Sequence, residues 1–202
     1  MIRGERRSAI AGPAGTLEVA FNVPDGALRG IALIAHPHPL QGGTLDNKVV
    51  QTLAKTFAAL AYAAVRFNFR GVGESEGQFD NGIGETDDAL AALAAAKLEF
   101  GELPVVLAGF SFGSYVQTRV AHAVAAERLV LVGPAVKRFP IETVAPDTIV
   151  IHGEEDDVVA LADVLEWARP QQLPIIVFPG SGHFFHGRLA QLQRVITGMW
   201  RA

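Results

Sequence analysis

Residues 107–116 read LAGFSFGSYV, and this stretch decides how the rest of the chain is interpreted. The apolar run before it is typical of a buried strand, and the SYVQTRVAHAV that follows has the pattern of a helix. A strand that turns at once into a helix holds Ser111 in a strained conformation, so only glycine is expected to fit at Gly109 and Gly113. The turn lifts the serine above the carboxyl end of the sheet, where open α/β folds bind ligands.

The composition limits the possible functions. Of the 202 residues 50% are hydrophobic and 19% are charged, which indicates a globular chain that we interpret as one domain over residues 1–202. The formal net charge of −4 argues against nucleic acid or an anionic membrane as a partner, since both need a basic face. There is no cysteine, which excludes disulfides, thiolate nucleophiles and cysteine-rich zinc sites.

Targeting signals are not evident either. The arginines near the N-terminus are not followed by the apolar stretch of a secretory signal. No segment approaches the ~20 apolar residues of a membrane-spanning helix. The sequence therefore predicts a soluble, cytoplasmic protein.

Short apolar runs alternate with longer amphipathic ones along the chain. Strands are predicted at 17–23, 30–35, 63–69, 105–108, 129–132, 148–151 and 175–178, and helices at 47–61, 85–100, 112–124, 160–169 and 184–200. This alternation predicts an α/β fold with a mostly parallel twisted sheet and helices on both faces. Only GPAVKRFPIETVAPD separates two of the strands, so no inserted cap domain fits there.

A serine hydroxyl needs a base that takes its proton, and the base needs an orienting group. Residues 148–159 (TIVIHGEEDDVV) place Asp156 and Asp157 just after a strand, and residues 174–187 (PIIVFPGSGHFFHG) place His183 after another. Asp157 also precedes a predicted helix, which it suits as an N-cap. The chain order, serine then acid then histidine, is that of the α/β-hydrolase fold.

Several motifs together resemble a known family. They are HPHPLQGGTLDNKVV (36–50), FNFRGVGESEG (67–77), GFSFG (109–113), HGEEDDVV (152–159) and GSGHFFHG (180–187). In this combination the chain is similar to small, lidless α/β-hydrolases, the serine hydrolases with HPHP-x-x-GG-T near the start. The resemblance implies Ser111 as nucleophile, His183 as base and, from the spacing G-x-x-D, Asp156 as acid with Asp157 as the alternative.

Two backbone N–H groups usually bind the oxyanion of such a reaction. Phe112 N–H, at the start of the helix, is the first expected donor. The second should come from HPHPLQGG, where prolines at 37 and 39 have no N–H, which leaves His38 or Leu40. The resemblance favours His38.

The sequence also contains residue types that could form other kinds of site. Potential metal ligands are His36, His38, His152, Asp156, Asp157, His183 and His186. The loop lacks the Asp-His that normally follows H-x-H in metal-dependent hydrolases, so no metal or other cofactor is expected. The glycines of RGVGESEG (70–77) are predicted to form a turn at the pocket edge, with Arg70 in a structural role, because a dinucleotide loop would open a helix there.

The expected function is therefore a serine hydrolase that cleaves small ester-type acyl substrates through an acyl-serine, like a carboxylesterase. The alternatives are a thioesterase or peptidase that uses the same residues, or a non-catalytic binding protein on a hydrolase scaffold. Four phenylalanines flank the predicted catalytic residues and are candidates to line an apolar acyl site: Phe110, Phe112, Phe184 and Phe185. Phe110 fits the core at least equally well.

Overall fold

One eight-stranded sheet organises the chain in the computed structural model, which describes residues 4–200. The spatial order is β1-β2-β4-β3-β5-β6-β7-β8; β1 pairs with β2 and β2 with β4 in antiparallel fashion, and the remaining pairs are parallel. The strands are β1 (Arg6–Gly12), β2 (Gly15–Asn22), β3 (Gly30–Ala35), β4 (Tyr62–Phe67), β5 (Val105–Phe110), β6 (Arg128–Val132), β7 (Ile149–Gly153) and β8 (Ile175–Phe178).

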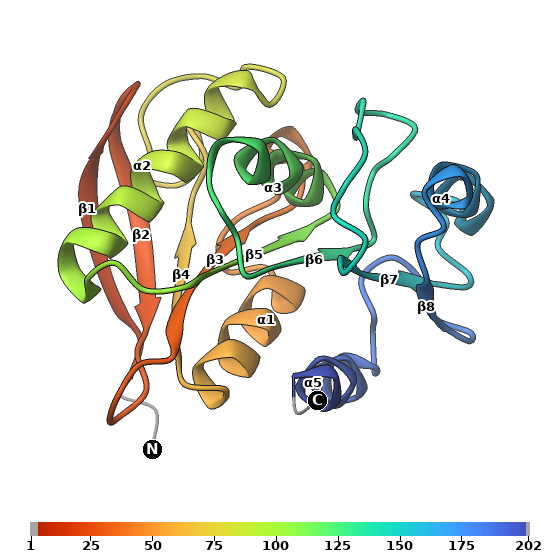
Figure 1. Ribbon diagram of the computed structural model, residues 1–202. Helices are drawn as coiled ribbons and strands as arrows, with labels where there is room; N and C mark the ends of the chain where they lie inside the picture. The colour runs from red at the N-terminus through yellow and green to blue at the C-terminus, as the bar shows by residue number, and fades with distance from the viewer. Residues whose placement is uncertain (1–3, 201–202) are drawn as a thin grey trace.

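Helices cover both faces of the sheet (Figure 1). The helices are α1 (Lys48–Ala59), α2 (Ile83–Phe100), α3 (Phe112–Ala123), α4 (Leu161–Ala168) and α5 (Leu189–Met199), with short 3₁₀ helices η1 (Pro39–Gln41) and η2 (Arg169–Gln171). Helices α1 and α5 pack on one face, whereas α2 and α3 pack on the other. None of the helices within residues 4–200 has both the length and the apolar character needed to cross a membrane.

The central strands β3, β4 and β5 consist entirely of buried residues. Successive side chains of a strand point to opposite faces, so a strand covered by helices on both sides has to be apolar throughout. On β3, Leu33 packs under α2 and α3, while its neighbour Ile34 packs under α1. This arrangement is the α/β-hydrolase fold that the sequence predicts.

Two local predictions were incomplete. Strand β1 was not predicted, because its sequence RRSAIAG begins with polar residues. It is an exposed edge strand, and charged side chains at such an edge discourage pairing with other chains. The predicted helix 184–200 begins only at Leu189, because residues 184–187 still belong to the loop that carries His183.

The topology determines where a site can form. From β3 the chain continues through α1 to β4 on one side, and then through α2 to β5 on the other side of β3. The crevice between the carboxyl ends of β3 and β5 is therefore a topological switch point, the usual ligand site of open α/β sheets. His38 follows β3 and Ser111 follows β5, so both lie at this point.

Candidate active site

Ser111 occupies the sharp turn between β5 and α3. Its backbone has φ 55° and ψ −118°, a strained conformation for a residue with a side chain, and it directly precedes α3 as the N-cap. A Cβ on Gly109 would lie 2.4 Å from the Gly113 carbonyl, and one on Gly113 would lie 2.3 Å from the Ala35 oxygen. The two flanking glycines are therefore required by close backbone approach, as the sequence suggests.

Asp156 and His183 form a buried pair beside this turn. His183 Nδ1 lies 2.6 Å from Asp156 Oδ2, and both residues are at most 7% exposed. The other carboxylate oxygen accepts the N–H groups of Val158 at 2.9 Å and Val159 at 2.7 Å. The carboxylate thus fixes Nδ1 as the protonated nitrogen of the ring, which leaves Nε2 free to accept a proton.

Burial and hydrogen bonding act in opposite directions on this carboxyl group. Burial raises the pKa of Asp156, but the hydrogen bonds from His183 and Val159 N–H outweigh it, and the net pKa is lowered. The loops of the pair are also joined by their backbones, since Glu155 N–H donates to Ser181 O at 2.9 Å. Asp156 is therefore held ionised and in position at neutral pH.

Asp157 has a different environment from its neighbour. Its side chain is exposed, and the N-cap of α4 is Ala160. The predicted capping role of Asp157 is therefore wrong; it is Asp156 that accepts the free N–H groups in this loop. The short Asp156–His183 contact supports Asp156 over Asp157 as the partner of the histidine.

The loop after β3 contains both candidates for the second oxyanion donor, His38 N–H and Leu40 N–H. Leu40 N–H is engaged by His38 Nδ1 at 3.2 Å, so of the two candidate donors only His38 N–H is available. Phe112 is the first residue of α3, and its N–H has no acceptor inside the helix. His38 N–H and Phe112 N–H therefore stay the two predicted oxyanion donors.

His36 controls the direction of the His38 N–H. Its Nδ1–H donates to Pro37 O at 2.7 Å, and its Nε2 accepts Phe69 N–H at 3.1 Å. The Pro37–His38 peptide is trans, so fixing its carbonyl also fixes the N–H on the opposite side. Burial lowers the pKa of His36 to about 3, which keeps the ring neutral and both hydrogen bonds intact.

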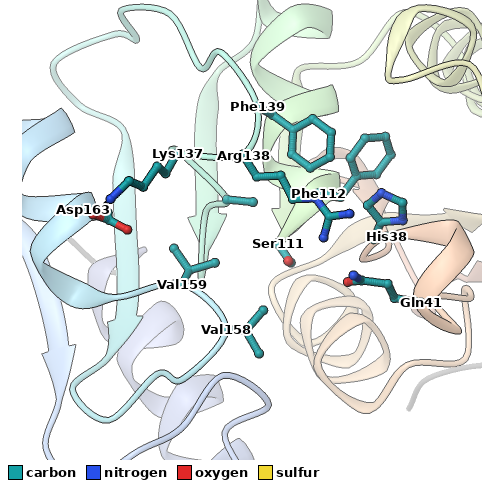
Figure 2. Close-up of a pocket in the computed structure, with 11 residues that line it drawn as sticks. His38, Gln41, Ser111, Phe112, Lys137, Arg138, Phe139, Val158, Val159 and Asp163 are labelled. Carbon is teal, nitrogen blue, oxygen red and sulfur yellow. Dashed lines mark hydrogen bonds and ion pairs between the residues drawn. The ribbon is translucent and has the colours of Figure 1, made fainter.

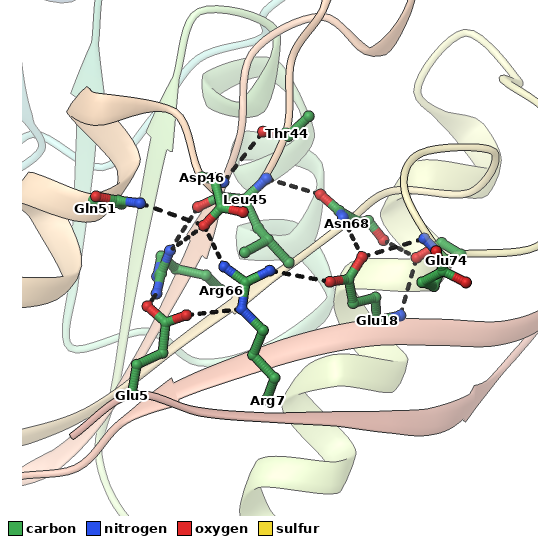
Figure 3. A network of polar contacts seen from close by, with 11 residues as sticks. Glu5, Arg7, Glu18, Thr44, Leu45, Asp46, Gln51, Arg66, Asn68 and Glu74 are labelled. Atoms are coloured by element: carbon green, nitrogen blue, oxygen red, sulfur yellow. Dashed lines mark hydrogen bonds and ion pairs between the residues drawn. The ribbon is translucent and has the colours of Figure 1, made fainter. Parts of the chain in front are cut away.

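The same loop is anchored further along by residues of β4 and its end. Leu45 O accepts Arg66 Nη1–H at 2.7 Å, and Leu45 N–H donates to Asn68 Oδ1 at 2.8 Å (Figure 3). Arg66 is 1% exposed, and its other terminal nitrogen contacts Glu5, which precedes β1. A network that begins at the N-terminal hairpin thus supports the loop that carries His38.

Two cavities meet at Ser111. The larger, of about 250 Å³, is lined by His38, Gln41, Ser111, Phe112, Ala135, Lys137, Arg138, Phe139, Val158, Val159 and Asp163 (Figure 2). The smaller, of about 90 Å³, is lined by Pro37, His38, Gln41, Gly42, Gly43, Asn47, Ser111, Val158, His183 and Phe184. Phe112 and Phe184 line these cavities, although the Phe112 side chain is itself largely buried. Phe110 and Phe185 line neither cavity and are buried in the core.

Two histidines beside the site, His36 and His152, are hydrogen-bonded to the protein backbone. Both ring nitrogens of His36 have protein partners, and His152 Nε2 donates to Val159 O at 2.9 Å. Among residues 4–200 no group of three or more histidine, cysteine or acidic side chains is arranged to hold a metal ion.

Arg70, which follows β4, has the structural role that its sequence context suggests. Its guanidinium contacts Asp88 on α2 through Nη2 at 2.8 Å and Nε at 3.0 Å, and its backbone N–H donates to the same carboxylate at 2.9 Å. Asp88 is fully buried. The pair fixes the RGVGESEG turn, which leads into the loop before α2.

Comparison with known proteins decides the family. The family model described as serine aminopeptidase, S33, matches residues 40–146, more than half of the chain. The chain belongs to this family of α/β-hydrolases. The protein is accordingly a hydrolase.

Solved structures agree with this assignment. This chain is 39% identical to an alpha-beta serine hydrolase homologue from Coxiella burnetii, with a TM-score of 0.89 and 95% of each chain covered. It is 34% identical to an α/β serine hydrolase without a lid from Xanthomonas campestris, with a TM-score of 0.92 and coverage of 98% of this chain and 94% of the other. An uncharacterized protein of Rickettsia prowazekii is 32% identical over 89% of this chain and 87% of its own. The protein is thus a small lidless α/β-hydrolase.

Sequence reasoning missed three residues of the hydrolase site. His36 was considered only as a metal ligand, although its position before a proline and directly after a buried strand places it in the core. His152 Nε2 lies 3.4 Å from Asp156 Oδ2 and donates a hydrogen bond to Val159 O, which holds the loop that carries Asp156. Arg138, which lines the larger cavity, comes from a loop with no recognisable motif.

Proposed function

We propose that this hydrolase cleaves small ester-type acyl substrates through an acyl-serine intermediate. The observation that carries the proposal is the buried hydrogen bond between Asp156 and His183, whose ring shares a cavity with the strained Ser111. This combination supports a serine made nucleophilic by an oriented imidazole.

Acylation begins when His183 Nε2 takes the proton of Ser111 Oγ and the oxygen attacks the ester carbonyl carbon. The carbonyl oxygen becomes an oxyanion, which the N–H groups of Phe112 and His38 stabilise. The bond between the carbonyl carbon and the alcohol oxygen then breaks, and His183 gives its proton to the leaving alcohol. Asp156 keeps the ring in the correct tautomer and stabilises its charged form.

Deacylation repeats these steps with water. His183 takes a proton from water, the hydroxide attacks the acyl-serine, and the carbon–Ser111 bond breaks. The proton on His183 returns to Ser111 Oγ, which regenerates the enzyme. The net reaction adds one water to one ester and yields an acid and an alcohol.

The charge of the larger cavity favours esters over aminopeptides. An aminopeptide would place a cationic amino group near the site, yet the cavity is lined by Lys137 and Arg138, with Asp163 already paired to Lys137 at 3.0 Å. A cationic wall repels a cationic substrate. A thioester would meet the same residues as an ester, and comparison of an ester and a thioester of one acyl group separates these two activities.

Two cavities of about 250 and 90 Å³ have room for short acyl chains but not for the long acyl chains of lipids. We therefore expect kcat/KM for p-nitrophenyl esters to be highest at short acyl length and to fall for long chains. A steady increase toward long chains would refute this part of the proposal.

Labelling with a fluorophosphonate tests the nucleophile. The wild-type protein should become labelled and should hydrolyse p-nitrophenyl acetate. Ser111→Ala should lose labelling and at least about 10⁴-fold in kcat/KM. Ser8→Ala, an exposed serine on β1, is the matched control and should behave as wild type. Wild-type protein that stays unlabelled while folded would instead support a non-catalytic binding role.

A further inference from the structure

The two cavities can be assigned to the two halves of an ester. His183 has to protonate the leaving alcohol, so the alcohol departs on the side of that ring. The smaller cavity is lined by His183, whereas the larger cavity is lined by Ser111 and Phe112 but not by His183. The larger cavity therefore receives the acyl half.

The acyl cavity has mostly apolar walls and one uncompensated charge. Lys137 and Asp163 neutralise each other at 3.0 Å. Across the part of the chain that the structure describes, residues 4–200, no carboxylate forms an ion pair with Arg138. Its guanidinium instead lies 5.8 Å from the centre of the Phe139 ring, which also lines the cavity.

The Arg138 guanidinium is directed at the reacting region. Figure 2 shows it pointing toward the space between Ser111 and His38, away from Lys137 and Asp163. Burial and, after it, the charge of Arg138 lower the pKa of His38, which is a second sign that the cation acts on this space. Gln41 faces the same cavity and offers a neutral polar group opposite the arginine.

We propose that the acyl group of the preferred substrate carries a carboxylate that Arg138 binds, so that the enzyme favours half-esters of short dicarboxylic acids. This inference rests on the proposed function of Ser111 and adds the substrate class. A guanidinium presents a planar set of donors that matches a carboxylate. The Phe139 ring, 5.8 Å from the Arg138 guanidinium, adds a weak cation–π contact. The apolar residues Ala135, Val158 and Val159 suit the methylene chain between the two carboxyl ends.

Two ethyl esters of equal chain length test the proposal. Monoethyl glutarate has the terminal carboxylate, and ethyl pentanoate has a methyl group in its place; release of acid is followed by titration at constant pH. The wild-type enzyme should have a kcat/KM at least about tenfold higher for monoethyl glutarate, which corresponds to about 1.4 kcal/mol. Added salt should weaken this preference and leave ethyl pentanoate unaffected.

Arg138→Gln should abolish the preference, mainly through a higher KM for monoethyl glutarate, and should change kcat/KM for ethyl pentanoate less than about twofold. Arg138→Lys should restore part of the preference. Arg194→Gln makes the same charge change at an exposed position on α5 outside both cavities, and should keep the wild-type preference.

The outcomes separate the two proposals. Suppose that ethyl pentanoate is hydrolysed and that this activity depends on Ser111. The carboxylate assignment alone would then be overturned if the enzyme had no preference for the half-ester, or if the preference survived Arg138→Gln. Hydrolysis that persists in Ser111→Ala, or no hydrolysis of either ester by the wild type, would overturn both the proposed function and the assignment that rests on it.

Discussion

Asp156→Asn isolates the role of one negative charge in the site. The asparagine Oδ1 can still accept the N–H groups of Val158 and Val159, which lie 2.9 and 2.7 Å from the carboxylate oxygen. Its amide NH₂ would then face His183 Nδ1, now 2.6 Å from Asp156 Oδ2. An NH₂ can only donate, so Nδ1 has to accept and the ring proton moves to Nε2.

With Nε2 protonated, the imidazole cannot take the proton of Ser111. The equivalent change in the serine-protease triad lowers kcat about 10⁴-fold with the geometry intact. We expect a fall of the same order here, equivalent to about 5.5 kcal/mol at about 1.4 kcal/mol per tenfold change. The fold should survive, because the shape and the two backbone hydrogen bonds are kept; Asp156→Ala would lose these and is a poorer test.

The assay is kcat/KM for p-nitrophenyl acetate, with circular dichroism and a thermal melt to verify folding. Asp157→Asn is the matched control, because it removes the neighbouring exposed carboxylate, and it should stay within about twofold of wild type. The reasoning is refuted if Asp156→Asn keeps more than about a tenth of the activity, or if Asp157→Asn loses as much as Asp156→Asn does.

Changes at two buried side chains, His36 and Asp88, test the supporting structure. His36→Leu should lower kcat about 10- to 100-fold with little change in KM, because the His38 N–H loses its orientation; an unchanged kcat would contradict this. The pKa of His36 is about 6.5 in the unfolded chain and about 3 in the folded chain, so between these pH values the proton binds more strongly to the unfolded chain. The free energy of unfolding should therefore fall by up to about 1.4 kcal/mol per pH unit as the pH drops through that range. Denaturant titrations at several pH values should show that the free energy of unfolding falls less steeply with decreasing pH in His36→Leu than in the wild type. Asp88→Ala should lower the free energy of unfolding by about 3 kcal/mol in urea, because Arg70 loses its buried partner, and the paired change Arg70→Met with Asp88→Leu should recover most of it.

The sequence was most informative where backbone geometry restricts the choice of residue. The turn around Ser111 leaves no room for a side chain at Gly109 or Gly113, so the motif can be recognised from the sequence alone. The central strands were recognised because burial on both faces demands continuous apolar runs. The polar edge strand β1 was missed because its stability comes from pairing with β2, which periodicity does not report.

Contacts between segments that are distant in the chain could not be predicted from the sequence for a similar reason. The choice between Asp156 and Asp157 depends on which carboxylate turns inward, and two adjacent identical residues look alike in a sequence. The second ring bond of His36 comes from Phe69, 33 residues away, after the next strand. Arg138 follows β6 in an irregular loop, and only the folded chain brings it to Ser111.

The support of Leu45 by Arg66 has a practical consequence for handling the protein. Glu5, which directly precedes β1, is an ion-pair partner of that inaccessible guanidinium. Removing Glu5, or fusing a bulky tag directly before it, would remove or displace a counter-charge beneath the loop that carries His38. Purification tags are better attached at the opposite terminus, and a loss of turnover after N-terminal shortening should not be taken as evidence that the first strand contacts substrate.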